Sequence, residues 1–347
     1  MGAARAVRVL AAVGSLALTG LGLVACEGGD VEPEPAHTAV RVGLAYDTGG
    51  PDDASINDSA SAGLDLAAET YDIETRALPA PPDESEAEKY GRLMSLCEGG
   101  YSPVIAVGSG YATAFNRAAA DCSTTTFAIV DAVVMAPNVT SLVFAEEQGS
   151  FLVGAAAALK SQTGHVGFVG GCGIPAIQRF EAGYVAGART VNASIQVDIT
   201  YLSTRDEACV GFDDPGKAKL AAAAMYDSGA DIVYQAARAA GTGVFQAAVE
   251  RQKRAIGSES DQYETVDPAL RHVIMTSMVR RVDVAVFGFI KAYVEGGVEP
   301  GVETYDLEHD GVVCSTSGGF IDDIIDQLDD YSTRIVDGEI AVPASPS

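Results

Sequence analysis

Short apolar runs alternate with helix-like segments along the chain from Val40 onward. VRVGLAY at 40–46 is mostly apolar, as expected of a buried strand, and the segment 60–72 carries apolar residues at helical spacing. Continuous apolar strands separated by helices indicate a parallel sheet with helices on both faces. The same pattern predicts strands at 73–80, 103–109, 126–134 and 140–147, and helices at 85–100 and 112–122.

The order of elements then starts again, so we expect two doubly wound α/β lobes of similar architecture. In open parallel sheets ligands bind beyond the carboxyl ends of the strands, which makes the polar loops there the candidate site. The second series has helices at 150–164, 177–191, 213–230 and 241–254, strands at 165–171, 196–203 and 231–237, a short strand within 253–262, apolar segments at 272–279, 281–297 and 309–315, and a helix at 320–336.

The first 25 residues have the layout of a signal peptide. A basic start precedes an uncharged apolar run that ends in LVAC at 23–26, which is similar to the lipobox of bacterial lipoproteins. Cleavage there would leave Cys26 as a lipid-modified N-terminus, followed by a flexible acidic tether over 26–39. A transmembrane helix and a plain signal peptide with a chance cysteine are the alternatives. Lipid on Cys26 predicts an exported protein held at the outer face of the cell membrane by this anchor only.

The charge balance narrows the range of partners. The 347 residues include 22 basic and 48 acidic side chains, a formal net charge of −26. No basic surplus is present to bind a phosphate backbone, so no nucleic-acid partner is expected. Self-repulsion of this kind favours a soluble monomer.

Five cysteines remain after Cys26, and in an exported protein they are disulfide candidates. None has C-x-x-C spacing, which argues against a metal site. Cys97 and Cys122 each end a helix-like segment beside one strand, and Cys172 and Cys209 each follow a strand. Both pairings stay open, and at least one thiol is left over.

The loop AYDTGGPDDASIND at 45–58 packs carboxylates, glycines and an asparagine into the end of the first strand. Its order of oxygens does not match a calcium loop, so a metal is not expected. A helix cap and a ligand contact both fit the Ser, Asn and Asp residues that precede the helix. No nucleophile elbow, phosphate loop or dinucleotide fingerprint is present, so neither an enzyme nor a cofactor is predicted.

The loop also carries a family resemblance. VRVGLAYDTGGPDDASINDSASAG resembles the D-x-G-x-x-D-D-x-S-F-N opening of the basic membrane protein family, lipoprotein substrate-binding components of ABC transporters that include purine nucleoside receptors. The likeness continues through TFAIVDAVV, VGFVGGCGIPAIQRFEAGYVAGA, FDDPGKAKLAAAAMYDSGADIVYQAA and TSMVRRVDVAV, and covers Val40 to about Val313.

The resemblance implies a type I periplasmic-binding-protein fold with two lobes joined by three crossovers. The expected N-terminal lobe spans 40–145 and 275–300, and the C-terminal lobe spans 146–274 and 301–347 with a terminal helix.

The resemblance also implies ligand contacts, which carry over by position. Asp47 and Asn57 match residues that hold the purine edge, and Asp131 matches a further carboxylate of the cleft. Ile56 stands where relatives have a stacking Phe, and Tyr234 matches the second aromatic. Asp261 and Arg280, the latter in place of a Lys, are expected near the sugar.

Three departures from the family pattern bear on specificity. Ile56 removes one stacking wall, Arg280 replaces a Lys, and Arg238 stands where the family keeps glycine. Two readings of Arg238 are open. It either admits a ligand with negative charge or forms a salt bridge with Glu259 or Asp261.

These features predict a lipid-anchored solute-binding protein that captures a nucleoside-like small molecule by lobe closure and delivers it to an ABC permease. The alternative is a ligand sensor or surface-interaction lipoprotein on the same fold without a role in transport.

Overall fold

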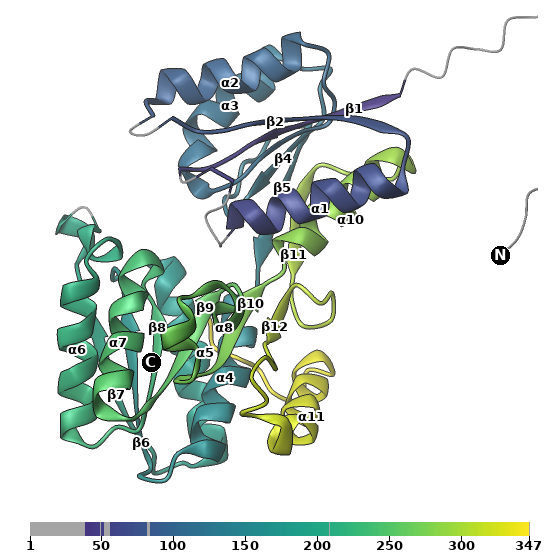
Figure 1. Ribbon diagram of the computed structural model, residues 1–347. Coiled ribbons are helices and arrows are strands. Elements are labelled where there is room, and N and C mark those ends of the chain that lie inside the picture. Colours follow the sequence, from purple (N-terminus) through teal and green to yellow (C-terminus); the bar gives the residue numbers. More distant parts are fainter. Residues whose placement is uncertain (1–38, 49, 52–55, 82–83, 208, 347) are drawn as a thin grey trace, which may run out of the picture. The chain divides into compact units, whose positions relative to one another are not determined.

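The chain forms two six-stranded sheets, each with helices along it (Figure 1). The structure is a computed structural model that describes residues 39–48, 50–51, 56–81, 84–207 and 209–346. The predicted signal peptide and lipidation site, Cys26 included, lie outside these residues, as does the tether except for Ala39. Within the described ranges no helix combines the length and the apolar character needed to span a bilayer.

The first lobe has the strand order β11-β5-β4-β3-β1-β2, with all neighbours parallel. Its strands are β1 (Val40–Ala45), β2 (Ile73–Leu78), β3 (Val104–Ala106), β4 (Phe127–Val130), β5 (Val139–Phe144) and β11 (Gly301–Tyr305). Its helices are α1 (Ile56–Thr70), α2 (Glu86–Glu98), α3 (Ala112–Asp121) and α10 (Val282–Val294).

The second lobe repeats the plan with the order β12-β10-β9-β8-β6-β7, in which only β12 runs antiparallel. Its strands are β6 (His165–Gly170), β7 (Gln196–Tyr201), β8 (Ile232–Ala236), β9 (Arg254–Glu259), β10 (Ile274–Arg280) and β12 (Val312–Cys314). Its helices are α4 (Glu146–Lys160), α5 (Pro175–Val191), α6 (Pro215–Ser228), α7 (Thr242–Arg251), α8 (Gln262–Thr265), α9 (Pro268–Arg271) and α11 (Ile325–Val336).

Local sequence signals explain where several helices begin and end. The Ser85 side chain caps α2, and the Glu88 carboxylate accepts the Ser85 backbone N–H at 2.8 Å in return. Asp214 caps α6 ahead of Pro215, and Gly229, at φ 121°, ends it. These are the signals that make the alternation of strands and helices readable from the sequence.

Two of the three expected crossover positions are corrected by the structure. The first crossing does fall between β5 and α4. However, β10 belongs to the second sheet, so 275–280 is not part of the first lobe, and β11 at 301–305 completes the first sheet rather than the second. In Figure 1 the green α10 lies beside the purple α1 of the first lobe. An apolar pattern predicts that a segment forms a buried strand. It does not tell which of the two sheets the strand joins, because both sheets have strands that are buried by helices.

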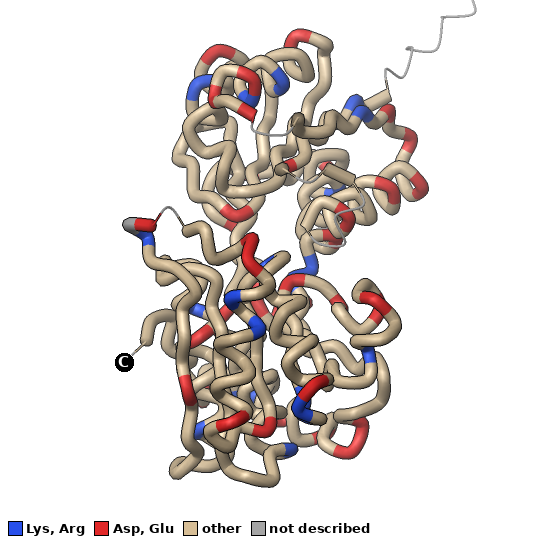
Figure 2. Tube along the Cα trace, turned by 60° about the vertical axis from the view of Figure 1, so that its left-hand side comes forward, with Lys and Arg blue, Asp and Glu red and all other residues tan. Residues whose placement is uncertain are grey.

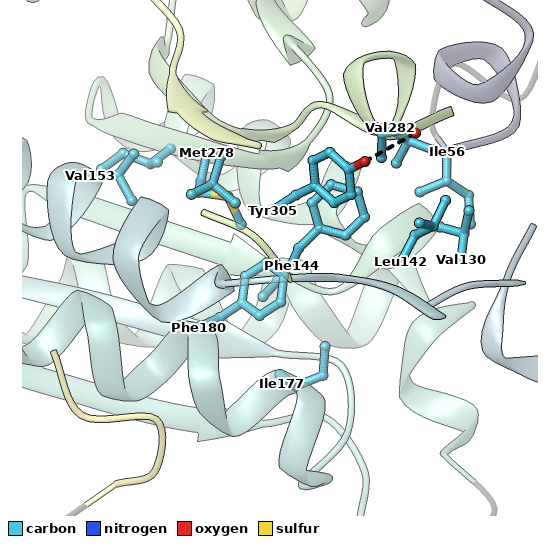
Figure 3. Packing of buried hydrophobic residues seen from close by; sticks show 14 of the residues in the cluster. Ile56, Val130, Leu142, Phe144, Val153, Ile177, Phe180, Met278, Val282 and Tyr305 are labelled. Atoms are coloured by element: carbon cyan, nitrogen blue, oxygen red, sulfur yellow. Dashed lines mark hydrogen bonds between the residues drawn. The ribbon is translucent and has the colours of Figure 1, made fainter. Parts of the chain in front are cut away.

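Aromatic side chains pack together at the first and third crossings, where the chain leaves the first sheet. Phe144 ends β5, Tyr305 ends β11, and their ring centroids lie 5.8 Å apart (Figure 3). The hydroxyl of Tyr305 donates to the backbone oxygen of Ala285 in α10 at 3.4 Å. The two strands that leave the first sheet are therefore joined by buried apolar contact at their carboxyl ends.

Glycines allow α4 and α5 to pack with their backbones in contact. A Cβ added to Gly183 of α5 would lie 2.0 Å from the Glu147 carbonyl oxygen, and one on Gly187 would lie 2.0 Å from the Phe151 oxygen. Gly154 of α4 faces the Tyr184 oxygen at 2.1 Å in the same way. Any larger residue at these positions must separate the two helices.

Gly183→Ala is expected to lower the free energy of unfolding by about 1–3 kcal/mol, because the added methyl group meets backbone rather than a movable side chain. Urea unfolding followed by circular dichroism measures the change. Gly91→Ala in exposed α2, where an added Cβ has nothing within 4 Å, is the control and should be neutral or stabilising. Equal stabilities of the two variants would contradict the close-packing account.

Candidate interlobe binding site

Two adjoining cavities open at the carboxyl ends of the strands. The first, of about 420 Å³, is lined by Asp47 and Ile56 from the first lobe and by residues of the second lobe. The second, of about 450 Å³, is lined by Asp131 of the first lobe among others. Both cavities are also lined by Arg238, Glu259 and Arg280, so they are parts of one cleft between the lobes.

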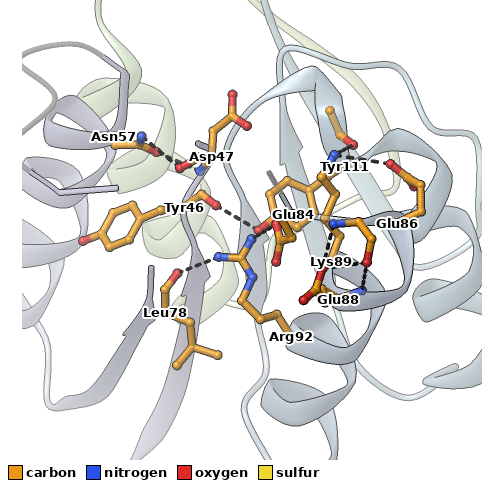
Figure 4. A network of polar contacts seen from close by, with 12 residues as sticks. Tyr46, Asp47, Asn57, Leu78, Glu84, Glu86, Glu88, Lys89, Arg92 and Tyr111 are labelled. Carbon is orange, nitrogen blue, oxygen red and sulfur yellow. Dashed lines mark hydrogen bonds and ion pairs between the residues drawn. The ribbon is translucent and has the colours of Figure 1, made fainter. Parts of the chain in front are cut away.

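Asp47 is the first-lobe carboxylate of this cleft, directly after β1. Its backbone is held by Asn57, whose side-chain oxygen accepts the Asp47 N–H at 3.0 Å and whose amide donates to the Asp47 carbonyl at 3.4 Å (Figure 4). Gly108, at φ 98°, passes so close that a Cβ there would lie 2.5 Å from Asp47 Oδ2. The carboxylate itself has no hydrogen-bond or ion-pair partner among the described residues. It is therefore positioned by the fold and left available.

Asn57 is fully buried and does not line either cavity. Its side chain fixes the turn that carries Asp47, and the direct ligand contact expected from the family stays a prediction. Ile56, one residue earlier at the start of α1, is 8% exposed and lines the first cavity.

A network of polar contacts made by Tyr111 and Arg92 supports the turn that carries Asp47. The Tyr111 hydroxyl donates to the Tyr46 carbonyl at 2.9 Å, next to Asp47 in the chain (Figure 4). Arg92 of α2 pairs with Glu84 and donates to the Leu78 carbonyl at 3.3 Å, and its guanidinium lies 5.3 Å from the Tyr111 ring centroid. The loops after β1 and β3 are thus connected to α2 through one set of polar contacts.

Arg280, at the end of β10, lies among three carboxylates from both lobes. Its Nη1 is 2.6 Å from Asp131 of the first lobe and 3.5 Å from Glu146 at the start of α4. Its Nη2 lies 2.5 Å from Glu259 at the end of β9, and its Nε donates to the same oxygen. The guanidinium also lies 5.4 Å from the Phe144 ring centroid. Arg280 therefore links the two lobes where the first crossing occurs.

Burial and charge act in opposite directions at this cluster. Burial opposes the charge on Arg280, but Asp131, Glu259 and Glu146 outweigh it, so the pKa of Arg280 is raised. Burial likewise dominates at Glu146, where it raises the pKa to about 7 against the attraction of Arg280. The protonated form of Glu146 is therefore favoured mainly by its burial, and the nearby charge of Asp131 acts in the same direction.

Arg238 does not form the salt bridge considered from the sequence. Among the described residues it has no ion pair with Glu259, Asp261 or any other carboxylate, and Glu259 is taken by Arg280 instead. Its guanidinium lies 5.4 Å from the ring centroid of Phe212, which lines the second cavity. Arg238 has φ 49°, a left-handed conformation that the glycine expected from the family pattern would adopt without strain.

The loop that carries Phe212 is tied to the end of β6. Cys172 and Cys209 form a disulfide, and the Ser203 hydroxyl donates to the Gly171 carbonyl at 2.8 Å while accepting the Gly211 N–H at 2.9 Å. A second disulfide joins Cys97 to Cys122, so both pairings considered from the sequence are present. The thiol of Cys314 is free, and burial raises its pKa to about 11.

Two predicted site residues point elsewhere. Tyr234 is fully buried in the second lobe, with its hydroxyl 3.2 Å from Ser150 and its ring 5.1 Å from that of Tyr184. It lies within a central strand, where the side chain is covered by helices rather than exposed at the strand end. Asp261 accepts a hydrogen bond from Ser317 at 2.5 Å and lines neither cavity. Its neighbours Ser260 and Gln262 line the first cavity in its place.

Phe212 and Glu146 are site residues that the sequence analysis did not single out, and Glu259 was considered there only as a partner of Arg238. Phe212 lies two residues before Asp214, the cap of α6, and such a strand-to-helix loop is the position where a ligand contact is expected. The sequence could not assign Glu146 or Glu259 to Arg280 in a chain with 48 acidic residues, because only the fold brings them together.

One group in the described ranges could ligate a metal, namely Asp306, Glu308 and His309. It lines neither part of the cleft. The His309 ring lies 2.8 Å from Asp306, a hydrogen bond that raises the pKa of this histidine. The cleft itself is lined by carboxylates, cations and the aromatic rings of Phe144, Phe180 and Phe212, a set suited to hold a polar organic molecule.

The fold and cleft are those of a two-lobed solute-binding protein. A solved ABC-transporter solute-binding protein from Aeropyrum pernix matches with a TM-score of 0.70 and 25% identity, over 89% of this chain and 94% of its own. A transcriptional activator of the comK gene from Bacillus halodurans matches with a TM-score of 0.73 and 25% identity, over 88% of this chain and 100% of its own.

A family profile then identifies the group. The profile described as Bmp, ABC transporter substrate-binding protein PnrA-like, matches residues 39–346, and the chain belongs to this family. The nucleoside-binding protein BmpA of an ABC transporter from Lactococcus lactis subsp. cremoris is 32% identical over 352 residues, covering 96% of this chain and 98% of its own. The CD4+ T-cell-stimulating antigen of Listeria monocytogenes is 33% identical over 322 residues, covering 88% of each chain.

Glu146→Gln is expected to change how stability depends on pH. The folded pKa of about 7 lies above the ordinary value of 4.5, so the stability linked to the bound proton is complete below pH 4.5 and is lost as pH rises through about 7. Glutamine mimics the protonated form, so the variant should gain about 1–3 kcal/mol on the native chain between about pH 5 and pH 8. Urea unfolding across this range measures it.

Glu264→Gln, at an exposed position, controls for the loss of one carboxylate. A difference between Glu146→Gln and the native chain that does not vary with pH would show that Glu146 stays ionised in the folded cluster.

Proposed function

We propose that this protein captures a nucleoside between its lobes and delivers it to an ABC permease. The observation that carries the proposal is the Asp47 carboxylate, which Asn57 and Gly108 hold at the wall of the cleft and which no described residue neutralises. An ionised carboxylate accepts hydrogen bonds from the N–H groups at the edge of a purine. The name of the Lactococcus relative, a nucleoside-binding protein, supports the same ligand class.

The charges around the cleft favour an uncharged ligand. Four carboxylates line the first cavity, whereas its two cations are Arg238 and Arg280, and Arg280 already has its own acidic partners. A phosphate or carboxylate on the ligand would lie near this acidic excess. Arg238 is then a partner for hydroxyl or ring acceptors of the ligand, and Phe212 offers one stacking face. Ile56 supplies apolar contact where relatives have the other aromatic ring.

Lobe closure is the mechanism that this arrangement supports. Asp47 belongs to the first lobe and Arg238 and Phe212 to the second, so a ligand that contacts all of them stabilises the state in which the lobes approach. The permease would recognise that state. No residue of the cleft is proposed to act on the ligand chemically, and the protein is a binding protein rather than an enzyme.

A sensor is the second candidate. A solved protein described as a transcriptional activator of the comK gene has the same fold over 88% of this chain, so the fold also occurs in a protein described as a regulator. In that case the closed state would be read by another partner. Genes for an ABC permease and ATPase next to this one would favour transport, and their absence would favour sensing.

Asp47→Ala is expected to abolish the binding of purine nucleosides measured by calorimetry against adenosine, guanosine and inosine. Asp47→Asn should weaken it by about 10- to 100-fold, because the charge of the acceptor is lost while its shape is kept. Asp65→Ala on the exposed face of α1 is the matched control and should bind like the native chain. If the native chain gives neither heat nor a thermal shift with any nucleoside, the ligand class is wrong.

Cys26→Ser is expected to move the protein from the membrane fraction to the soluble fraction, because we propose that a lipid on Cys26 is the only anchor. Fractionation with immunoblotting measures the distribution. Cys314→Ser removes a thiol from the folded part and should leave the protein in the membrane fraction. Retention of the Cys26 variant in membranes would indicate an uncleaved membrane span instead.

A further inference from the structure

A further cavity, of about 400 Å³, lies at the opposite end of the second sheet from the interlobe cleft. It opens at the amino ends of β8, β9 and β10, where Ile232 and Arg254 start their strands and Met275 is the second residue of its own. The same strand β9 therefore carries Arg254 at this cavity and Glu259 at the cleft. The two sites share no lining residue.

Three cations converge on this cavity from separate elements. Lys160 ends α4, Lys253 follows the left-handed turn at Gln252 after α7, and Arg254 begins β9. Such a convergence is unusual in a chain with 22 basic and 48 acidic residues, whose acidic segments recur along much of the trace in Figure 2.

Two of these cations lack an acidic partner. Neither Lys253 nor Arg254 lies within ion-pair distance of a carboxylate in the described ranges of the chain, whereas Lys160 pairs with exposed Asp323 at 2.8 Å. Arg254 is nevertheless held in place. Its Nη1 donates to the His272 carbonyl at 2.5 Å, and its guanidinium lies 4.4 Å from the Phe320 ring centroid. Its Nε and Nη2 make no hydrogen bond with described residues.

The one carboxylate that lines the cavity is already engaged. Asp231 accepts the Ser161 hydroxyl at 2.7 Å and the backbone N–H groups of Gln162 and Thr163 at 2.6 and 3.1 Å. Its oxygens are used to hold the turn after α4, so they do not neutralise Lys253 or Arg254 by direct contact. The cavity thus offers unpaired positive charge in a walled space.

We propose that this cavity is a binding site for a phosphate group. A guanidinium with free N–H donors and two nearby ammonium groups matches the charge and the several acceptor oxygens of a phosphate better than those of a single carboxylate. The volume exceeds that of inorganic phosphate and leaves room for a small ester beside Phe320. The phosphate can belong to a soluble ester or to a phospholipid headgroup, and the two sources are separated by experiment.

The test uses the full chain carrying Cys26→Ser, so that no lipid anchor contributes to membrane binding. Calorimetry and thermal shift with inorganic phosphate and glycerol phosphate, at ionic strength matched with sodium chloride, probe the soluble source. Co-sedimentation with phosphatidylglycerol vesicles, compared with phosphatidylcholine vesicles, probes the lipid source. Lys253→Gln combined with Arg254→Gln should weaken the observed binding by about tenfold or more.

Arg205→Gln combined with Lys291→Gln removes the same charge at exposed positions and should leave the phosphate affinity unchanged. Binding to soluble phosphate identifies an ester site, and binding to anionic vesicles alone identifies a headgroup site. Failure of all probes, equal losses in the two double variants, or a loss caused by Arg238→Gln instead would overturn the proposal. Nucleoside affinity should be the same in the Lys253/Arg254 variant, so this result is independent of the proposed nucleoside function.

Discussion

The buried guanidinium of Arg280 is the contact on which the arrangement of the cleft depends. It lies between Asp131 of one lobe and Glu259 of the other, with Glu146 of the first crossing beside it. Removing the cation would leave three carboxylates close together with little water, which is far less favourable than losing an exposed pair. β10 lies in the second sheet and Asp131 adopts a left-handed turn. Together these two features bring opposite charges into contact at the carboxyl ends of the strands.

Because these charges neutralise one another, the charged residues of the cleft fall into two groups, one that pairs within the protein and one that is available to a ligand. Arg280 and its carboxylates satisfy one another and form the floor, whereas Asp47 and Arg238 have no ion pair among the described residues and lie on opposite lobes. A polar ligand can then bridge two groups that the protein itself leaves apart. Phe212 is fixed beside Arg238 because the disulfide between Cys172 and Cys209 and the hydroxyl of Ser203 hold its loop.

Much of the fold could be predicted from the sequence, since apolar strands, capped helices and glycine stops are local signals. The class of fold and the family are confirmed, and Asp47, Ile56, Asp131, Arg238 and Arg280 do line the cleft. Tyr234 and Asp261 do not, because a residue number near a strand end does not tell which way the side chain points. The later crossings were misplaced for a related reason: the strand pattern of β10 and β11 records burial but not the partner strand.

The position of β11 in the first sheet, after most of the second lobe in the chain, also affects the order in which the protein folds during synthesis. During synthesis the strands β1 to β5 are made early. On its outer side, however, β5 pairs with β11, which is made only after β10 and α10. Until then β5 is an open sheet edge, and α1 lacks the α10 surface against which it packs. The first lobe begins first but is completed only after most of the second lobe has been made, and a chain that stops after α10 would expose a β5 edge able to pair with another copy.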